Sequence, residues 1–144
     1  MIRCGRSRRV KMSDPGEELK EKTQRTAELY FRGYGEERPF ELWRSFDRDL
    51  ARDLSLFITG KFYAREKIPH TVRQLVAVAA LTVLERTEEL KLHLYGALNV
   101  GCDPKEIAEV IFQMVPYAGV PVVNSALKVL RTVLQEKSLW PLYP

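Results

Sequence analysis

Apolar residues recur at spacings of three and four along almost the whole chain, and this repeat constrains the fold more than any other sequence feature. After Pro39 it forms an aromatic-rich stripe. From Thr71 to Leu84 it covers so much of the circumference that we expect a central helix. No segment shows the alternation of a strand bounded by turn pairs. The sequence therefore predicts an all-α fold, a single domain of about six helices.

Caps and breakers predict where these helices begin and end. The expected boundaries are a stop near Gly33 to Gly35, a break at Gly60, a connector over 61–68 closed by Pro69, an N-cap at Thr87, a stop at Gly101, an N-cap at Asp103 before Pro104, and a last helix opened by Pro121.

The basic residues are concentrated at the N-terminus. Without the first eleven residues, 18 Lys and Arg remain against 19 Asp and Glu, so the body is almost neutral and we expect no nucleic-acid partner. We interpret residues 1–12 as a disordered basic tail, or as a segment before a translation start at Met12, and 13–144 as the helical domain. The five cations of this segment are Arg3, Arg6, Arg8, Arg9 and Lys11.

The two thiols, Cys4 and Cys102, indicate neither a disulfide framework nor a metal cluster and fit a reducing compartment. No apolar run approaches the ~20 residues that span a bilayer, and the basic start lacks the apolar stretch of a secretory signal. There is no Gly-rich phosphate loop, Cys-x-x-Cys, His-x-x-x-His pair or Gly-x-Ser-x-Gly elbow. We expect a cytoplasmic protein without metal, cofactor or membrane partner.

His93, one of two histidines, lies on the apolar face of the helix predicted after Thr87. Glu89 precedes it by four residues, so both side chains lie about one turn apart on adjoining parts of one face. A Glu that orients a His is a general acid–base pair. The alternative is a buried structural histidine bonded to a backbone carbonyl.

Arg65, Arg73 and Arg86 lie near the ends of the two central helices, where their planar guanidinium groups are suited to a small carboxylate ligand. The alternative for each is a solvated surface arginine or an ion pair with a neighbouring glutamate. Tyr117 supplies a hydroxyl that is a candidate for substrate binding or for a structural hydrogen bond, and Gln113 and Asn124 leave the same choice open.

These residues together resemble the carboxymuconolactone decarboxylase family, which shares its all-helical fold with the alkyl hydroperoxidase D proteins. The resemblance covers roughly 57–134. The matching positions are Gly60, Arg65, Pro69, Arg73-x-Leu75, Arg86, Glu89-Leu90, Leu92-His93-Leu94, Gly101, Tyr117-Ala118-Gly119-Val120-Pro121, Asn124 and Ala126.

The hydroperoxidase branch is similar but carries Cys-x-x-Cys-x-x-x-His ending at the same histidine. This chain has Arg86 and Glu89 in place of the two thiols. Peroxidatic chemistry needs a thiolate and a resolving thiol, so we expect that activity to be lost, and we do not expect Cys102 to replace them. The chain also departs from the decarboxylase branch at Thr59 and Tyr63, where tryptophans are usual, and this leaves the substrate open.

The resemblance implies a lyase of aromatic-acid catabolism that removes CO₂ from a small carboxylated lactone without cofactor. His93 is then the proton donor, Glu89 its orienting partner, and Arg65, Arg73, Arg86 and Tyr117 bind the anionic substrate. It also implies a homo-oligomer, a trimer or hexamer. Two alternatives remain: an antioxidant relative that has lost its cysteine pair, and a noncatalytic oligomeric ligand-binding protein.

Overall fold

The computed structural model describes residues 14–143, and within this range the secondary structure is entirely helical. The predicted all-α class is confirmed; the expectation about the basic tail lies outside the described residues. The elements are α1 (Pro15–Phe31), α2 (Pro39–Phe46), α3 (Arg48–Ser55), the π-helix η1 (Leu56–Tyr63), α4 (His70–Val83), α5 (Thr87–Asn99), α6 (Pro104–Phe112), α7 (Val115–Ala118) and α8 (Val120–Glu136).

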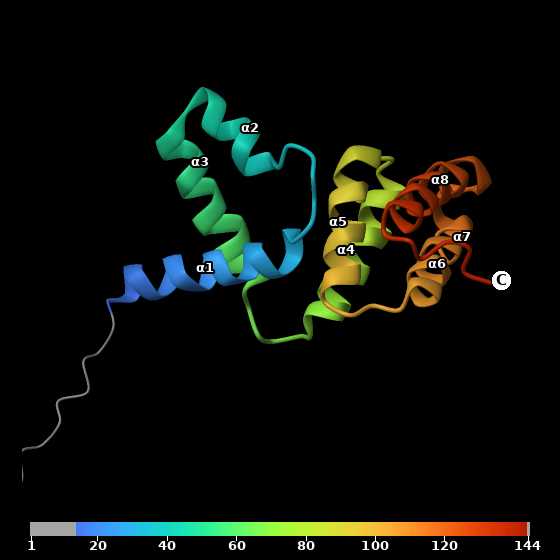
Figure 1. Ribbon diagram of the computed structural model, residues 1–144, viewed down its shortest axis with the longest axis horizontal. Coiled ribbons are helices and arrows are strands. Elements are labelled where there is room, and N and C mark those ends of the chain that lie inside the picture. Colours follow the sequence, from blue (N-terminus) through green and yellow to red (C-terminus); the bar gives the residue numbers. More distant parts are fainter. Residues whose placement is uncertain (1–13, 144) are drawn as a thin grey trace, which may run out of the picture.

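The core is built around α5, which packs against α1, α4 and α8 (Figure 1). Because α5 is covered on several sides, consecutive residues from Leu94 to Ala97 are all buried. The expected central helix α4 packs on α5 and on α6. The largest fully buried apolar side chains are Tyr30, Leu90, Leu94, Ile107, Ile111, Leu134, Val78 and Val133.

Two predicted helix starts had different outcomes. Asp103 caps α6 as expected, since its carboxylate accepts a hydrogen bond from the Lys105 amide at 2.7 Å. The predicted N-cap at Thr87 is wrong, because Thr87 is already the first residue of α5 and no side chain caps that helix. The turn before it is closed by the backbone instead: the Arg86 amide donates to the carbonyl of Leu81 at 3.0 Å.

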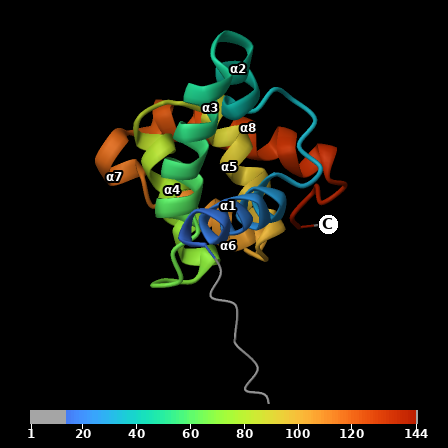
Figure 2. The same ribbon diagram turned by 90° about the vertical axis from the view of Figure 1, so that its left-hand side faces the viewer.

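The predicted stripe after Pro39 is divided into separate helices at Asp47. This residue has extended backbone angles, with φ −150° and ψ 115°, and its carboxylate accepts a hydrogen bond from the Leu50 amide at 2.9 Å. Asp47 therefore ends α2 and caps α3. The two helices form a hairpin that rises from α1 in Figure 1, with α2 at its far end when the molecule is turned (Figure 2).

The expected break at Gly60 is also wrong, because Gly60 is buried inside η1 and the helix continues to Tyr63. The Ala64 amide donates to the Thr59 carbonyl, five residues earlier, at 2.8 Å. A Cβ at position 60 would lie 2.8 Å from Cδ1 of Leu19 and still closer to Oγ1 of Thr23. Glycine thus lets η1 approach α1, which is a packing role and not a helix stop.

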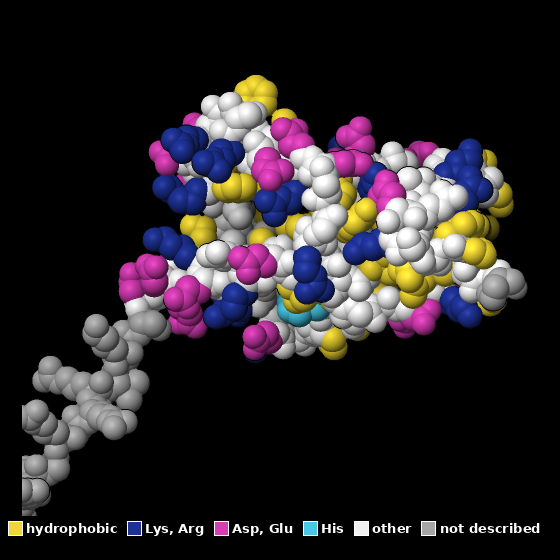
Figure 3. Space-filling model, viewed as in Figure 1, with side chains coloured by type: hydrophobic (Ala, Val, Ile, Leu, Met, Phe, Trp, Pro, Cys, Tyr) yellow, Lys and Arg dark blue, Asp and Glu magenta, His cyan; other side chains and the backbone are white. Residues whose placement is uncertain are grey.

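The hairpin buries little of its apolar surface. No residue of α2 is buried, Phe46 is 87% exposed and Leu50 is 52% exposed. Hydrophobic side chains also appear in the hollow between the hairpin and the rest of the molecule, with charged side chains around it (Figure 3). Large apolar side chains remain exposed along the hairpin and η1, namely Phe40, Leu42, Trp43, Phe46, Leu50, Phe57, Ile58 and Phe62.

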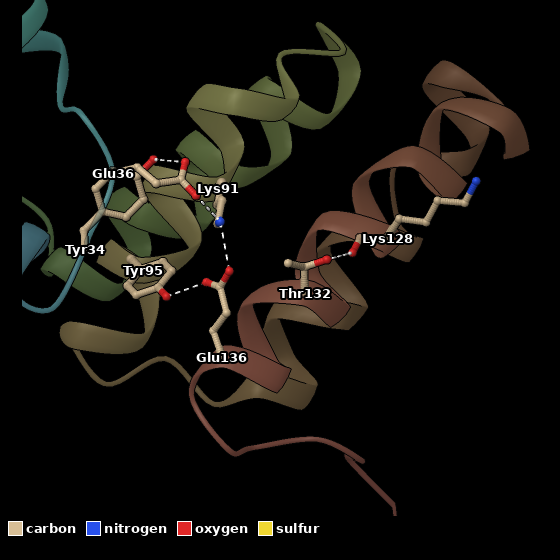
Figure 4. Close-up of polar contacts among 7 residues, drawn as sticks. All are labelled: Tyr34, Glu36, Lys91, Tyr95, Lys128, Thr132 and Glu136. Atoms are coloured by element: carbon tan, nitrogen blue, oxygen red, sulfur yellow. Dashed lines mark hydrogen bonds and ion pairs between the residues drawn. The ribbon is translucent and has the colours of Figure 1, made fainter.

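Lys91 connects three parts of the chain (Figure 4). Its ammonium group pairs with Glu36, in the connection after α1, and lies 3.0 Å from the Glu136 carboxylate at the end of α8. Glu136 also accepts a hydrogen bond from the Tyr95 hydroxyl at 2.6 Å. These contacts hold the α1–α2 connection and the end of α8 against α5. No helix within 14–143 has the length and apolarity needed to cross a membrane.

Candidate functional site

His93 borders a solvent-open cavity of about 670 Å³ that is lined by residues of α1, α2, α3, η1 and α5. Apolar and aromatic side chains predominate in its lining. Such a cavity is of the size and polarity that take small organic ligands. The lining includes Ala27, Tyr30, Phe31, Phe40, Leu54, Ile58, Thr59, Tyr63, Leu92 and His93, and its charged residues are Lys20, Glu28, Arg38 and Arg52.

The imidazole of His93 is held by a hydrogen bond and by a stacked ring. Its Nδ1 lies 3.0 Å from Oε1 of Gln74, a fully buried residue of α4. The ring of Tyr63 stacks on it, with centroids 5.6 Å apart and planes inclined by 28°. A carbonyl oxygen only accepts, so Nδ1 carries the proton in this arrangement and the unshared pair is on Nε2.

Burial lowers the pKa of His93 to about 4. The negative charge of Glu89 raises this pKa, but by less than burial lowers it. An imidazole surrounded by apolar groups loses hydration chiefly in its charged form, so the neutral form is favoured. His93 is therefore neutral at pH 7. In that state Nε2 is ready to accept a proton.

Glu89 lies near His93 but does not hold it. The carboxylate is exposed, no hydrogen bond joins it to the imidazole, and it acts on His93 through its charge. The orienting contact comes instead from Gln74, which sequence reasoning missed as a site residue. The available signal was its position on the buried face of α4, one turn before Val78, because a buried amide needs a hydrogen-bond partner.

The three predicted arginines do not converge on His93 within one chain. Arg73 is half-buried and its guanidinium donates to the Arg65 carbonyl at 2.8 Å, so these two lie together. The charge of Arg73 lowers the pKa of Tyr63, although burial raises that pKa more, which places the guanidinium near one wall of the cavity. Arg86 is exposed in the α4–α5 turn and Tyr117 is 71% exposed on α7. None of the four borders the cavity.

Other cations border it, and the sequence analysis did not name them. Arg38 forms an ion pair with Glu41 at 2.9 Å, and Arg52 pairs with Asp49 and Asp53 at 3.1 Å each. All of these groups are on the hairpin, and the ion pairs are partly exposed. The cavity wall facing α1 thus carries two guanidinium groups, each paired with an acidic side chain of the hairpin.

Cys102 has no place at this site. It is buried, its Sγ lies 3.6 Å from the Thr71 carbonyl, and burial raises the pKa of the thiol to about 11. A thiol that is protonated at neutral pH is a poor nucleophile. No group of three His, Cys, Asp or Glu residues within 14–143 is arranged to hold a metal ion.

The fold and site define an all-helical protein with an apolar cavity beside one buried, neutral histidine. Comparison with known proteins is consistent with this class. The model of the carboxymuconolactone decarboxylase family matches residues 48–132, and the chain belongs to that family.

Two relatives illustrate the range of the similarity. The chain is 32% identical over 104 residues to the 4-carboxymuconolactone decarboxylase of Acinetobacter baylyi, covering 72% of this chain and 78% of the relative. It is 35% identical over 80 residues to an uncharacterised 15.0 kDa protein in the nqo9–nqo10 intergenic region of Paracoccus denitrificans, covering 54% of this chain and 60% of the relative.

Proposed function

We propose that the protein is a carboxymuconolactone decarboxylase-like carboxy-lyase that acts on a small carboxylated lactone or a related acid. The observation that carries the proposal is the position of His93, which is held through Nδ1 by Gln74 and borders an apolar cavity. The similarity to a 4-carboxymuconolactone decarboxylase over 72% of the chain supports the same reaction class.

In this reaction the bond between a skeleton carbon and a carboxylate breaks, CO₂ leaves, and the electron pair left on the skeleton takes up a proton. An apolar wall favours the step, because it solvates a leaving carboxylate poorly and neutral CO₂ well. Lys20, Arg38 and Arg52 supply positive charge for a carboxylate that remains on the substrate. Proton donation by a positioned side chain contributes roughly 10²- to 10⁴-fold in rate.

The proton donor is His93, which must first become charged. An anionic substrate beside the imidazole favours the imidazolium form, and the nearby Glu89 acts in the same direction. The substrate thus brings the acid into its active form on binding. When CO₂ leaves, the negative charge that remains on the skeleton draws the Nε2 proton to carbon.

The predicted substrate-binding residues divide into two groups under this proposal. Arg73 lies near Tyr63 and adds positive potential to the cavity wall from its own chain. Arg65, Arg86 and Tyr117 are exposed and away from the cavity, so a binding role for them requires a second copy of the chain.

We therefore also propose a homo-oligomer, a trimer or hexamer as the family resemblance implies. The exposed apolar side chains of α2, α3 and η1 support this, since the helices within residues 14–143 leave them uncovered. The same hairpin forms one wall of the cavity. A second copy that covers the hairpin thus also stabilises the site.

The test is turnover of carboxylated γ-lactones, followed as CO₂ release and by mass spectrometry of the product. We expect decarboxylation by the native protein, loss of it in His93→Gln, and full retention in Cys102→Ser. Tight binding of such acids without product would instead favour a noncatalytic ligand-binding protein. Peroxide consumption that Cys102→Ser abolishes would favour the antioxidant relative.

A further inference from the structure

A row of buried polar groups leads away from His93 through the interior. Gln74 and Tyr30 are 0% and 1% exposed, so the polar groups of both side chains are withdrawn from solvent. The Tyr30 hydroxyl is 2.5 Å from Nδ1 of His70, which begins α4 one turn before Gln74. Both histidines in the chain are therefore at the ends of one row, His93–Gln74–Tyr30–His70.

The Gln74 amide is the central group of this row. Its Oε1 accepts from His93, whereas its Nε2 is buried and finds no hydrogen-bond partner of good geometry among residues 14–143. The amide nevertheless acts on the Tyr30 hydroxyl: burial raises the pKa of Tyr30 to about 12, and hydrogen bonding from Gln74 opposes that rise. The Gln74 amide and the Tyr30 hydroxyl therefore lie near each other, although no hydrogen bond of good geometry joins them.

Gly96 leaves the space that this amide occupies. A Cβ at position 96 would lie 2.9 Å from Oε1 of Gln74 and 3.1 Å from its carbonyl carbon. Because Gly96 follows His93 by less than one turn of α5, the absence of its side chain lets Oε1 lie against the helix beside the imidazole. A larger residue at position 96 would therefore displace the Gln74 amide from His93.

We infer that Gln74 and Tyr30, together with His70, are positioning residues that hold His93 as the tautomer with the proton on Nδ1 and the unshared pair on Nε2. His70 Nδ1 accepts the Tyr30 proton, so the hydroxyl oxygen offers its unshared pairs to Nε2 of Gln74. That orientation points Oε1 at His93, and Oε1 in turn fixes the proton on Nδ1.

The row orients His93 and does not conduct protons. A carboxamide has no readily exchanged proton to pass on, and a tyrosine with a pKa near 12 remains protonated at neutral pH. The alternative acceptor for Tyr30 is the Tyr63 carbonyl at 3.4 Å, which is a longer contact than the one to His70. Loss of His70 therefore weakens the preference without removing every partner of the hydroxyl.

The expected effect of these residues on catalysis rests on the proposed function, but the tautomer of His93 can be measured whether or not the protein is an enzyme. We would label the imidazoles with ¹⁵N and record their two-bond ¹H–¹⁵N correlations at pH 7 on the full chain without ligand. With only two histidines present, a His70→Leu sample assigns the spectrum. We expect the native His93 to show the Nδ1–H pattern.

Tyr30→Phe removes the hydroxyl but keeps the buried ring, and we expect it to give His93 a mixture of both tautomers. His70→Leu, at a half-buried helix start, is the second variant and should shift the mixture in the same direction. Tyr34→Phe is the matched control, because the Tyr34 hydroxyl bonds to Glu36 away from this row. It should leave the pattern unchanged.

A native Nε2–H pattern, or an Nδ1–H pattern that Tyr30→Phe and His70→Leu both leave intact, would overturn the inference. In an active protein the same two variants should lower kcat several-fold with KM little changed. If the tautomer responds as expected and no acid is decarboxylated, the positioning row stands and the proposed function fails.

Discussion

Nδ1 of His93 lies 3.0 Å from Oε1 of Gln74, so an uncharged amide on α4 holds the imidazole where a carboxylate partner was expected. An adjacent carboxylate raises the pKa of a histidine, whereas an amide leaves the effect of burial in place. Burial with an uncharged partner explains why His93 is neutral at pH 7. It also determines how the protein responds to pH and to an anionic ligand.

Stability should fall as pH falls from about 6.5 to about 4, in part because of His93. Its pKa is lowered from 6.5 to about 4 in the folded chain, so the unfolded chain binds the proton first. Stability from this group is complete above pH 6.5 and lost progressively below it, by about 3 kcal/mol at full extent. Denaturant unfolding at pH 7 and pH 4.5, for native protein and His93→Gln, checks this.

The comparison with His93→Gln is needed because carboxylates also titrate near pH 4. The variant should show a shallower loss of stability between pH 6.5 and 4.5, since glutamine does not titrate. Equal pH dependence in the two proteins would mean that His93 is not held neutral by burial.

Binding of a dicarboxylate should take up a proton. The anion raises the pKa of His93 from about 4 toward neutrality, so a neutral imidazole becomes charged as the complex forms. Titration calorimetry in buffers of different ionisation enthalpy, at pH 6, measures the protons taken up per ligand. We expect a value between zero and one that disappears in His93→Gln; binding with no proton uptake in the native protein would contradict the proposed activation of the acid.

Cys102 should react with thiol reagents only when the chain unfolds. It is 4% exposed and burial raises the pKa of its thiol to about 11, so both access and thiolate are lacking. In a Cys4→Ser background, labelling by a disulfide reagent should be slow in buffer and fast in denaturant. Rapid labelling of Cys102 in the folded protein would contradict this prediction and would favour a thiol-based activity.

We expect the hairpin of α2 and α3 to form part of the oligomer interface. Phe46→Glu places a charge on a side chain that is 87% exposed in one chain and, by our proposal, buried between copies. Light scattering should give a mass above that of one chain for the native protein and a smaller mass for Phe46→Glu. Lys128→Glu, a charge change at an exposed position of α8 outside the hairpin and η1, is the control. A monomeric native protein at micromolar concentration would contradict the proposal.

The helical class and the cap at Asp103 were predictable because both depend on local signals, namely apolar spacing and a side chain bonded to its own helix. The position of His93 on an apolar face was predictable for the same reason. The choice of Gln74 over Glu89 was not, since both lie within reach of His93 and only the packing of α4 on α5 decides which of them is buried.

The cavity was hidden from sequence reasoning by the hairpin. A continuous helix after Pro39 would not place Arg38 and Arg52 on one wall of the cavity. The extended backbone at Asp47 divides this segment into two helices, but the spacing of the apolar residues continues across Asp47 and gives no sign of the division. The π-helix η1 was not predictable from the sequence either. A spacing of three or four between apolar residues does not reveal backbone hydrogen bonds that span five residues.

Gly60→Ala should destabilise the protein although alanine favours helices. The added Cβ would meet Leu19 at 2.8 Å and Thr23 still closer, so η1 and α1 must move apart. Overpacking of this kind costs roughly 1–3 kcal/mol. Gly35→Ala is the matched control, because nothing lies within 4 Å of its Cβ and its φ is not positive. Denaturant midpoints measure both variants. An unchanged midpoint for Gly60→Ala would show that α1 and η1 pack less closely than in this structure. Because Tyr63 of η1 stacks on His93, we also expect Gly60→Ala to reduce the affinity for a ligand in the cavity.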